Sequence, residues 1–389
     1  MNAESASGFI LHRSSFIVFL AALLLYGLTA LLGGNFHHQE LAYFSQLAEA
    51  VLHGKLYLPN PDGTHDLILY QGRWYVPFPP GPALLLLPFV ALWGVGFNEV
   101  LLSAAVGALN VVLMHRLLQA LAARGLSRLD RRGLLWLTAL FAAGTAHWYA
   151  APTGTVSFLA HICAVTGLTA ALWLAAERRS PWLVGLAMAW ALLCRPTLIL
   201  ASPAVLALLL TSSGGACQPA AEGGRTAGKT AGAAATFAAP LALAIGLLLA
   251  YNAARFGSPL EFGYRWAQTQ APHLAEKLAT WGQFSPHYLA ENLRVALLGL
   301  PLLRPKPPFI WPDPNGMSVL LVTPVFFWLV HARQRNWVVA ASWLSLALVS
   351  VPLLLYYNTG WVQFGYRFSL DFLPLAYLLL ATGLKRITP

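Results

Sequence analysis

Charged residues are scarce in this chain of 389 residues, and their scarcity excludes an ordinary water-soluble fold. Asp, Glu, Lys and Arg together make up 10% of the sequence, whereas hydrophobic residues make up 58% and the mean hydropathy is +0.61. In a bilayer, backbone groups must form hydrogen bonds within their own segment, because lipid offers no partners. The composition therefore predicts a protein made mostly of membrane-crossing helices.

Cysteine and acidic residues are also few. Cys163 and Cys194 lie in apolar runs and Cys217 lies in a loop, a spacing that supports neither a disulfide framework nor a zinc site. The chain has 24 basic and 14 acidic residues, which give a formal net charge of +10. The basic excess falls mainly in short loops between apolar runs, so it indicates membrane orientation and not binding to nucleic acid.

Long apolar runs predict an all-α polytopic membrane protein of about ten to eleven transmembrane helices. The runs cover residues 14–32, 83–94, 100–121, 134–151, 156–176, 182–193, 197–210, 233–250, 317–330, 337–355 and 368–384. We expect one integral membrane domain over residues 1–389. The first run is too long for the core of a typical signal peptide and no small-x-small cleavage site follows it, so we expect an uncleaved helix with its N-terminus inside.

Two stretches leave the topology open. In the first arrangement, residues 83–94 do not cross the membrane and the break at Arg195-Pro196 separates two spans. In the second arrangement, residues 83–94 cross the membrane and residues 182–210 form one kinked span. The first places every basic cluster inside, so the charge bias favours it. Both arrangements place the long loops 33–82 and 252–315 on the outer face, and residues 212–231 are expected to be a flexible loop.

The loop 33–82 is the longest polar, aromatic-rich interruption in the first half of the chain. Residues 40–53 alternate apolar and polar side chains at helical spacing, which predicts an amphipathic helix that Gly54 ends. Residues 273–294 of the second loop have a similar periodicity, which predicts helical structure along the outer surface.

The first loop also carries motifs that resemble a known family. An acidic residue opens the amphipathic helix, and A-x-x-x-L-x-G-x-L-Y-L (48–58) and G-R-W-Y-V-P-F-P-P-G-P-A-L-L-L-L-P (72–88) follow. The residues that carry the resemblance are Glu40, Ala48, Leu52, Gly54, Leu56, Tyr57, Tyr75, Pro79, Pro80, Pro82 and Pro88, with further similar segments at 194–196, 251–252, 255–259, 262–264 and 364–374. The chain resembles bacterial members of the GT-C superfamily, the multi-spanning glycosyltransferases that include protein O-mannosyltransferases and lipid A aminoarabinose transferases.

The resemblance implies a GT-C-like fold and transfer of a sugar from a polyprenyl-phosphate donor to a hydroxyl group, with inversion by direct displacement. Such a reaction uses a carboxylate base, for which the candidate is Glu40, where the family commonly has Asp. It also benefits from negative charge near the transition state, and Asp66 is the candidate second carboxylate. The departing lipid phosphate needs cationic groups, and the candidates are Arg195, Arg255, Arg265 and Arg367. The candidates for contact with the sugar or the acceptor are Tyr43, Trp74, Tyr75, Tyr264 and Trp266.

Each candidate has a structural alternative. Glu40 is expected in the first turn of a helix, where an acid stabilises the helix dipole. Asp66 fits a turn, and Arg195 fits a side chain that reaches from the membrane to its interface. Asp371 lies four residues after Arg367, a spacing that predicts an ion pair between them. His37 and His38 beside Glu40 would suit a divalent ion, but adjacent histidines point apart, so we expect no cofactor.

These observations favour a glycosyltransferase in the cytoplasmic membrane with its active site on the outer face. Its expected partners are a polyprenyl-phosphate sugar donor, the lipid bilayer and a glycan, lipid or protein acceptor. The alternative is a transporter or flippase of lipid-linked sugars, although the spans are nearly free of ionisable residues apart from His161 and Asp371 and show no half-to-half repeat. A third class, a non-catalytic membrane scaffold, would need neither the carboxylates nor the arginines.

Overall fold

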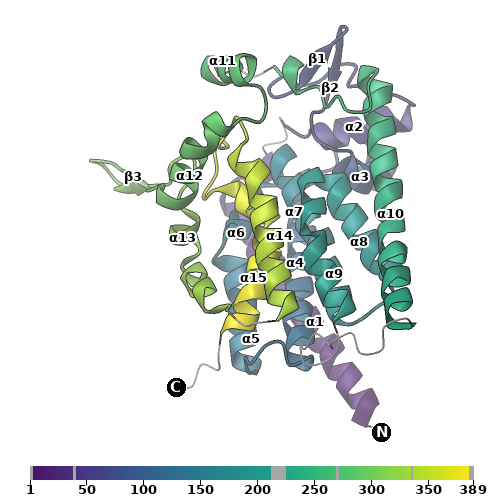
Figure 1. The fold of residues 1–389 in the computed structure, drawn as a ribbon. Helices are drawn as coiled ribbons and strands as arrows, with labels where there is room; N and C mark the ends of the chain where they lie inside the picture. The colour runs from purple at the N-terminus through teal and green to yellow at the C-terminus, as the bar shows by residue number, and fades with distance from the viewer. Residues whose placement is uncertain (1–2, 38–40, 212–224, 269–270, 334–335, 385–389) are drawn as a thin grey trace.

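The computed structural model describes residues 3–37, 41–211, 225–268, 271–333 and 336–384, and helices dominate them (Figure 1). The α-helices are α1 Ala3–Leu32, α2 Tyr43–Leu52, α3 Gly81–Trp93, α4 Glu99–Ala123, α5 Arg131–Ala143, α6 Ala146–Thr153, α7 Val156–Ala176, α8 Pro181–Cys194, α9 Ser202–Leu210, α10 Arg225–Phe256, α11 Pro272–Trp281, α12 Leu289–Leu298, α13 Val319–Val322, α14 Trp337–Leu354 and α15 Leu373–Gly383. The 3₁₀ turns are η1 Asn35–His37, η2 Pro196–Ala201, η3 Tyr264–Trp266, η4 Pro286–Tyr288, η5 Pro324–His331 and η6 Arg367–Asp371.

Two small antiparallel hairpins interrupt the helices. Strands β1 Ile68–Tyr70 and β2 Arg73–Tyr75 pair with Leu69 opposite Trp74. Strands β3 Leu302–Leu303 and β4 Ile310–Trp311 pair with Leu303 opposite Ile310. Both hairpins lie within the long loops that the hydropathy pattern predicts.

Long apolar helices confirm the predicted all-α polytopic membrane class. Five helical segments of the described chain are long and apolar enough to cross a bilayer: Ser14–Leu32, Glu99–Ala123, Val156–Ala176, Gly228–Phe256 and Trp337–Leu354. Shorter apolar helical segments are Gly81–Trp93, Pro181–Cys194, Pro196–Leu210 and Leu373–Gly383. The predicted number of ten to eleven spans stays a prediction.

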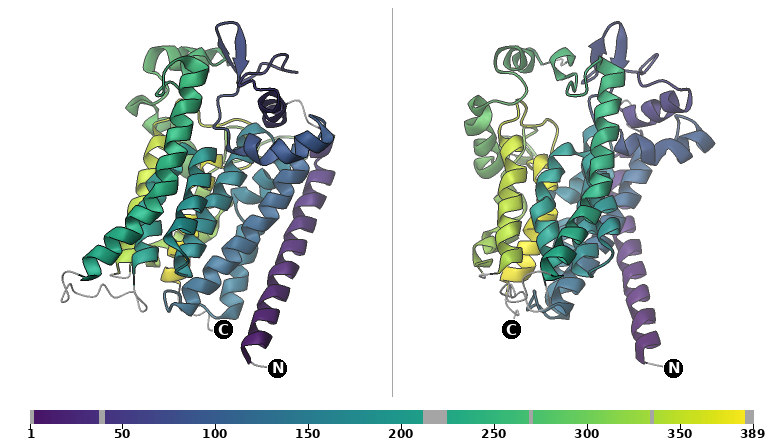
Figure 2. Two further views of the ribbon diagram at one scale, coloured as in Figure 1. Left: turned by 90° about the vertical axis from the view of Figure 1, so that its right-hand side faces the viewer. Right: turned by 45° about the vertical axis from the view of Figure 1, so that its right-hand side comes forward.

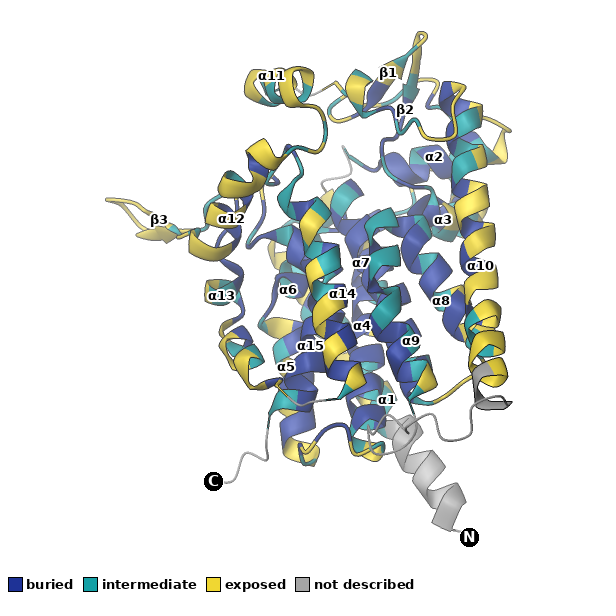
Figure 3. Ribbon diagram, in the orientation of Figure 1, coloured by how far each residue is buried: buried dark blue, intermediate teal, exposed yellow. Residues whose placement is uncertain are grey.

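Helix α7 lies at the centre of the bundle and α1 and α10 lie at its edge. In the most apolar window of each helix, 78% of the residues are buried in α7, against 17% in α1 and 28% in α10. Figure 3 shows the exposed outer face of α10 beside the buried interior. Because lipid is as apolar as these side chains, the exposed faces suit a bilayer.

Both chain ends lie at one end of the bundle, and the long segments 33–82 and 252–315 lie mainly at the other (Figures 1 and 2). Helix α3 lies across that second end and does not run along the bundle (Figure 2, left). Arg178 lies just before α8 and Thr211 lies just after α9, and Arg178 Nη2 donates a hydrogen bond to the Thr211 carbonyl at 3.2 Å. The start of α8 and the end of α9 therefore lie at the same end of the bundle. The topology across the membrane that the basic loops favour stays a prediction.

Helix α2 confirms the amphipathic helix expected at 40–53, shortened to residues 43–52. Glu99, in the first turn of α4, accepts a hydrogen bond from the Ser45 backbone N–H at 2.6 Å. A carboxylate at this place satisfies a free N–H of the first helical turn and complements the helix dipole. The contact fixes α2, and with it Tyr43, against the bundle.

Four expected segments have different bounds. Residues 134–151 form α5 and α6, because Thr145 accepts a hydrogen bond from His147 N–H and starts a new helix. Residues 273–294 form α11 and α12, because Gly282 takes φ +72° and ends the first. Residues 317–330 form α13 and η5 with Pro324 at the start of the 3₁₀ turn. Residues 225–231 of the expected flexible loop belong to the alanine-rich start of α10, and residues 212–224 lie outside the described residues.

Gly81 permits a close approach between α3 and the end of α8. A Cβ at this position would lie 2.6 Å from Cys194 Sγ and 2.8 Å from the Leu193 carbonyl oxygen. We expect Gly81→Ala to lower the free energy of unfolding by about 1 to 3 kcal/mol, because the helices must move apart. Thermal unfolding of the detergent-purified protein measures this. Gly96→Ala is the control, since its Cβ would meet nothing within 4 Å; equal melting temperatures for the two variants would contradict the expectation.

Candidate active site

Two adjoining cavities occupy the end of the bundle beneath the long segments. The first, the arginine chamber, has a volume of about 270 Å³ and is lined by Arg195, His161, Tyr264, Tyr356 and Tyr357 among others. The second, the hydroxyl chamber, has a volume of about 750 Å³ and is lined by Tyr43, Tyr149, Thr153, Thr155 and Thr359 among others. Both are lined by Asp66, Phe78, Ser157, Asn358 and Arg367, which therefore mark the junction.

A buried charge cluster forms one wall of the arginine chamber. Asp371 Oδ2 accepts hydrogen bonds from Arg195 Nε at 3.2 Å and Nη2 at 2.9 Å, and Asp371 Oδ1 lies 2.8 Å from His161 Nδ1. The side chains of His161 and Asp371 are fully buried. The cluster joins α7, the turn between α8 and η2, and η6, which are far apart in the sequence.

The predicted ion pair between Arg367 and Asp371 is wrong, because Asp371 pairs with Arg195 and His161. Residues 367–371 form the 3₁₀ turn η6 and not an α-helix. In a 3₁₀ turn, side chains three residues apart align and those four apart do not. Arg367 and Asp371 therefore point to different partners.

Arg367 is consequently a cation without a carboxylate partner among the described residues. Its Nε is buried and forms no hydrogen bond within the described chain. Its Cζ lies 5.6 Å from the centre of the Phe158 ring and 5.4 Å from that of Phe368, so aromatic faces hold the guanidinium. A guanidinium with free donors at a cavity wall suits a bidentate anion such as phosphate.

Asp66 supplies a carboxylate at the same junction. Its backbone has φ +62°, a left-handed conformation that Asp tolerates better than most residues. Its N–H donates to the Gln268 carbonyl at 3.1 Å, which fixes the loop, while 55% of its side chain stays exposed. His65 Nε2 lies 3.5 Å from Asp66 Oδ2. Asp66 and Arg367 thus bring opposite charges to one boundary.

Three tyrosines supply hydroxyl groups to the arginine chamber. Burial is the main cause that raises the pKa values of Tyr264, Tyr356 and Tyr357, and so keeps these phenols protonated. Tyr264 and Tyr356 meet edge to face, with ring centres 6.4 Å apart. Protonated phenols beside a guanidinium can donate hydrogen bonds to an anion. Sequence reasoning named Tyr264 but missed Tyr356 and Tyr357, whose one signal is a Tyr-Tyr pair directly after an apolar run.

Hydroxyl and amide side chains share the lining of the second chamber with apolar and charged side chains. Tyr43 O–H donates to the His65 carbonyl at 3.0 Å, and burial, aided by the nearby Asp66 and Asp62, raises its pKa to about 12. Further hydroxyl and amide side chains in the lining are Asn35, Tyr149, Thr153, Thr155, Ser157, Asn315, Asn358 and Thr359. At the same wall, Lys277 of α11 forms an ion pair with Glu291 of α12. Such a lining suits a ligand that carries many hydroxyl groups.

Two of the four predicted arginines lie outside both chambers. Arg255 donates to the Val76 carbonyl and to Asn252 Oδ1, each at 2.8 Å, and so ties α10 to the segment after β2. Arg265 pairs with Glu261, and its side chain is 67% exposed. The chambers therefore hold Arg195 and Arg367 of the predicted set.

Three of the predicted aromatic contacts also lie elsewhere. Tyr75 is buried beside Phe256, and Trp266 packs at a tilt against Tyr70 with ring centres 4.3 Å apart. Trp74 pairs through its backbone with Leu58. These rings hold the hairpin β1–β2 together, whereas Tyr43 and Tyr264 line the chambers.

Glu40 and His38 lie outside the described residues, so the structure places neither of them. Leu41, the described residue directly after Glu40, lines the hydroxyl chamber, and so does Asn35, three residues before His38. His37 is exposed in η1. Within the described part of the chain, no three His, Cys, Asp or Glu side chains gather as a metal site would require. The expectation about a metal stays a prediction.

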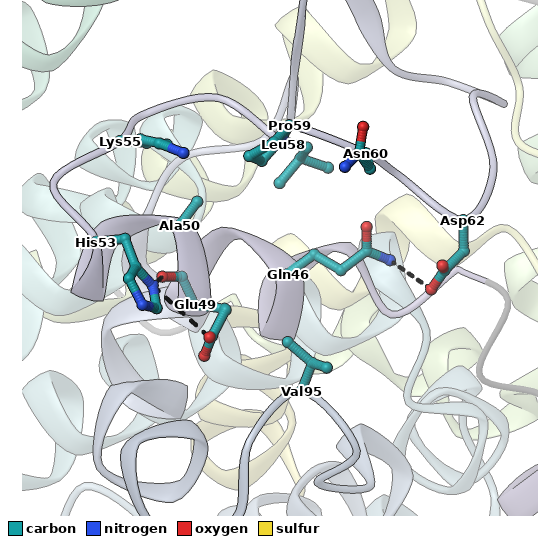
Figure 4. Close-up of a pocket in the computed structure, with 10 residues that line it drawn as sticks. All are labelled: Gln46, Glu49, Ala50, His53, Lys55, Leu58, Pro59, Asn60, Asp62 and Val95. Atoms are coloured by element: carbon teal, nitrogen blue, oxygen red, sulfur yellow. Dashed lines mark hydrogen bonds and ion pairs between the residues drawn. The ribbon is translucent and has the colours of Figure 1, made fainter.

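A third cavity, of about 280 Å³, lies between α2 and the loop that follows it (Figure 4). Four of its polar side chains form two pairs: Gln46 donates to Asp62 at 3.4 Å, and His53 lies 3.6 Å from Glu49. It shares no lining residue with the two chambers. The junction of the chambers is therefore the candidate active site.

The fold and the site define a helical membrane protein with a charged, aromatic-walled cavity at one end of its bundle. No protein-family model and no curated protein matches the chain. Among solved structures, the chain is similar to the Archaeoglobus fulgidus oligosaccharyltransferase in its apo form, with a TM-score of 0.43 and 13% sequence identity. The match covers 94% of this chain and 50% of the other, so the chain spans about half the length of the protein that it matches.

The charge cluster predicts a large cost for removing its carboxylate. In Asp371→Asn, Arg195 loses the charge that compensates its burial, and we expect the free energy of unfolding to fall by about 3 to 5 kcal/mol. Thermal or denaturant unfolding in detergent measures the change. Arg265→Gln is the control, because an exposed ion pair contributes about 0 to 1 kcal/mol. An Asp371→Asn variant as stable as the control would show that the cluster does not hold the helices together.

Proposed function

We propose that this protein is a glycosyltransferase that moves a sugar from a polyprenyl-phosphate donor to a hydroxyl acceptor at the outer face of the cytoplasmic membrane. The observation that carries the proposal is the junction of the chambers, where the Asp66 carboxylate and the unpaired Arg367 guanidinium line the same boundary. This reaction needs one group that accepts a proton and another that holds a phosphate. The motifs that resemble GT-C glycosyltransferases support the same reaction.

In this proposal the donor phosphate binds in the arginine chamber. Arg367 supplies free guanidinium donors, Arg195 adds a positive charge held by Asp371, and the phenols of Tyr264 and Tyr356 supply neutral donors. Apolar lining residues, Phe262, Phe284, Pro352 and Leu353, suit the first isoprenoid carbons. Charge that develops on the departing phosphate is stabilised by these preorganised groups.

The acceptor binds in the hydroxyl chamber, on the other side of the junction. The oxygen of the acceptor hydroxyl bonds to the anomeric carbon while Asp66 accepts the proton of that hydroxyl. At the same time the bond between the anomeric carbon and the phosphate oxygen breaks. The lipid phosphate leaves with the bonding electrons, and a single displacement inverts the anomeric centre. Glu40 remains the other base candidate, on the grounds of sequence alone.

A flippase of lipid-linked sugars is the second candidate, because Arg195 and Arg367 would serve a transported phosphate equally well. A flippase, however, needs no carboxylate at the phosphate site. The position of Asp66 beside Arg367 favours the transferase. The two functions therefore differ in the fate of the donor and in their dependence on the carboxylates.

Replacing each carboxylate tests the transferase. Purified protein is incubated with a panel of polyprenyl-phosphate sugars, and release of free polyprenyl phosphate is measured. We expect Asp66→Asn to reduce release by about 100-fold or more, since a general base contributes at least that much. Asn tolerates the left-handed backbone, so the fold is kept.

Glu40→Gln is tested in parallel. The control is Asp62→Asn, which removes an exposed carboxylate from the part of the loop near α2. Full release by both Asp66→Asn and Glu40→Gln would remove the proposed base, and movement of intact donor across vesicles by those variants would support the flippase.

Replacing Arg367 tests the phosphate site. We expect Arg367→Gln to weaken binding of the lipid phosphate by about 10- to 100-fold, the value of a lost hydrogen bond to a charged group. Titration of the purified protein with polyprenyl phosphate measures it, and Arg265→Gln is the matched control. Unchanged binding in Arg367→Gln would place the phosphate elsewhere.

A further inference from the structure

Residues 300–313 form an arm that leaves the bundle after Gly299 and returns to it at residues 314–318, where the Pro314, Asn315 and Met317 carbonyls accept hydrogen bonds from Gln363 and Tyr366. The Ser318 backbone N–H donates to the Gly299 carbonyl at 2.8 Å and closes the base of the arm. Strands β3 and β4 lie beyond this base and extend sideways from the bundle, beside α12 (Figure 1). None of residues 300–313 lines either chamber.

The arm is apolar and uncovered. Its large exposed side chains are Leu300, Leu302, Leu303, Phe309, Ile310 and Trp311. Leu303 is 82% exposed and Ile310 is 63% exposed, and Figure 3 shows the arm as an exposed projection. Two exposed basic residues, Arg304 and Lys306, lie in the turn between the strands, and Arg304 Cζ lies 4.5 Å above the Trp311 ring.

Such an arm requires an apolar surface. An isolated two-stranded hairpin is at best marginally stable in water, and this one has strands of two residues each. The hydrocarbon core of a bilayer is equally unsuitable, because the outer edges of both strands carry unpaired backbone groups. The boundary between head groups and acyl chains meets both demands, since it accepts apolar side chains and still supplies hydrogen-bond partners.

The position and charge of the arm fit that boundary. The arm runs across the bundle axis, below α11 and the hairpin β1–β2, near the end of α14 (Figure 1). Trp and basic side chains together are typical of the membrane interface. We propose that residues 300–311 are an interfacial anchor that inserts Leu303, Phe309 and Ile310 among lipid acyl chains and places Arg304 and Lys306 against anionic phospholipid head groups.

A fluorescent label at Ile310 tests the insertion. Cys163 and Cys194 are buried, so full-length protein with Cys217→Ser gives a background for single cysteines. Ile310→Cys carries a polarity-sensitive fluorophore, and Leu69→Cys on the hairpin β1–β2 is the matched control. In nanodiscs of phosphatidylcholine and phosphatidylglycerol, we expect blue-shifted emission at position 310 that lipids brominated near the head group quench. The label at position 69 should be quenched by aqueous iodide instead.

A second variant tests the proposed contact of Arg304 and Lys306 with anionic head groups. Combining Arg304→Gln with Lys306→Gln should weaken partition of the arm into anionic discs by about fivefold for each charge removed. Discs of phosphatidylcholine alone should reduce the difference between the variant and the parent.

Two results would overturn the anchor. The first is iodide quenching at position 310 equal to that at position 69. The second is protection that persists in detergent and rises with protein concentration, which would assign the arm to a second copy of the chain. Both results are independent of whether the protein transfers a sugar.

Discussion

The buried carboxylate of Asp371 is the constraint on which the site depends. One oxygen pairs with Arg195 and the other lies 2.8 Å from His161, so a single side chain holds η6 against α7 and the turn after α8. Removal of these charges from water is costly, and only mutual pairing offsets it. The carboxylate therefore fixes the relative position of three segments that come from distant parts of the sequence.

That pairing also decides which cation remains available. Since Asp371 is occupied by Arg195 and His161, Arg367 keeps its donors free while Phe158 and Phe368 hold its guanidinium. The Asp66 carboxylate reaches the same boundary from a loop whose backbone is held by Gln268. His161 Nε2 is buried without a partner among the described residues, which leaves one further polar group beside the arginine chamber. The site is thus built from the buried charge cluster and from the loop that carries Asp66.

Hydropathy predicted much of the architecture, because a bilayer imposes long apolar runs on any chain that crosses it. It predicted the two long segments at one end of the bundle and the amphipathic helix that became α2. The same periodicity did not show that 273–294 divides or that 317–330 is largely 3₁₀, since single Gly and Pro residues decide such breaks. The short strands β1 and β2 also escaped prediction, because three-residue strands leave no detectable alternation.

The sequence alone determined the membrane class, the aromatic and arginine-rich character of the loops and the identity of most candidate residues. Only the tertiary structure decided their use: Arg195 and Arg367 reach the chambers, whereas Arg255 and Arg265 are engaged elsewhere. The physical reason is that residue spacing reports neighbours within a helix, as in the expected pair of Arg367 and Asp371. Partners such as His161 and Asp371, 210 positions apart, are chosen by helix packing, which no local pattern records.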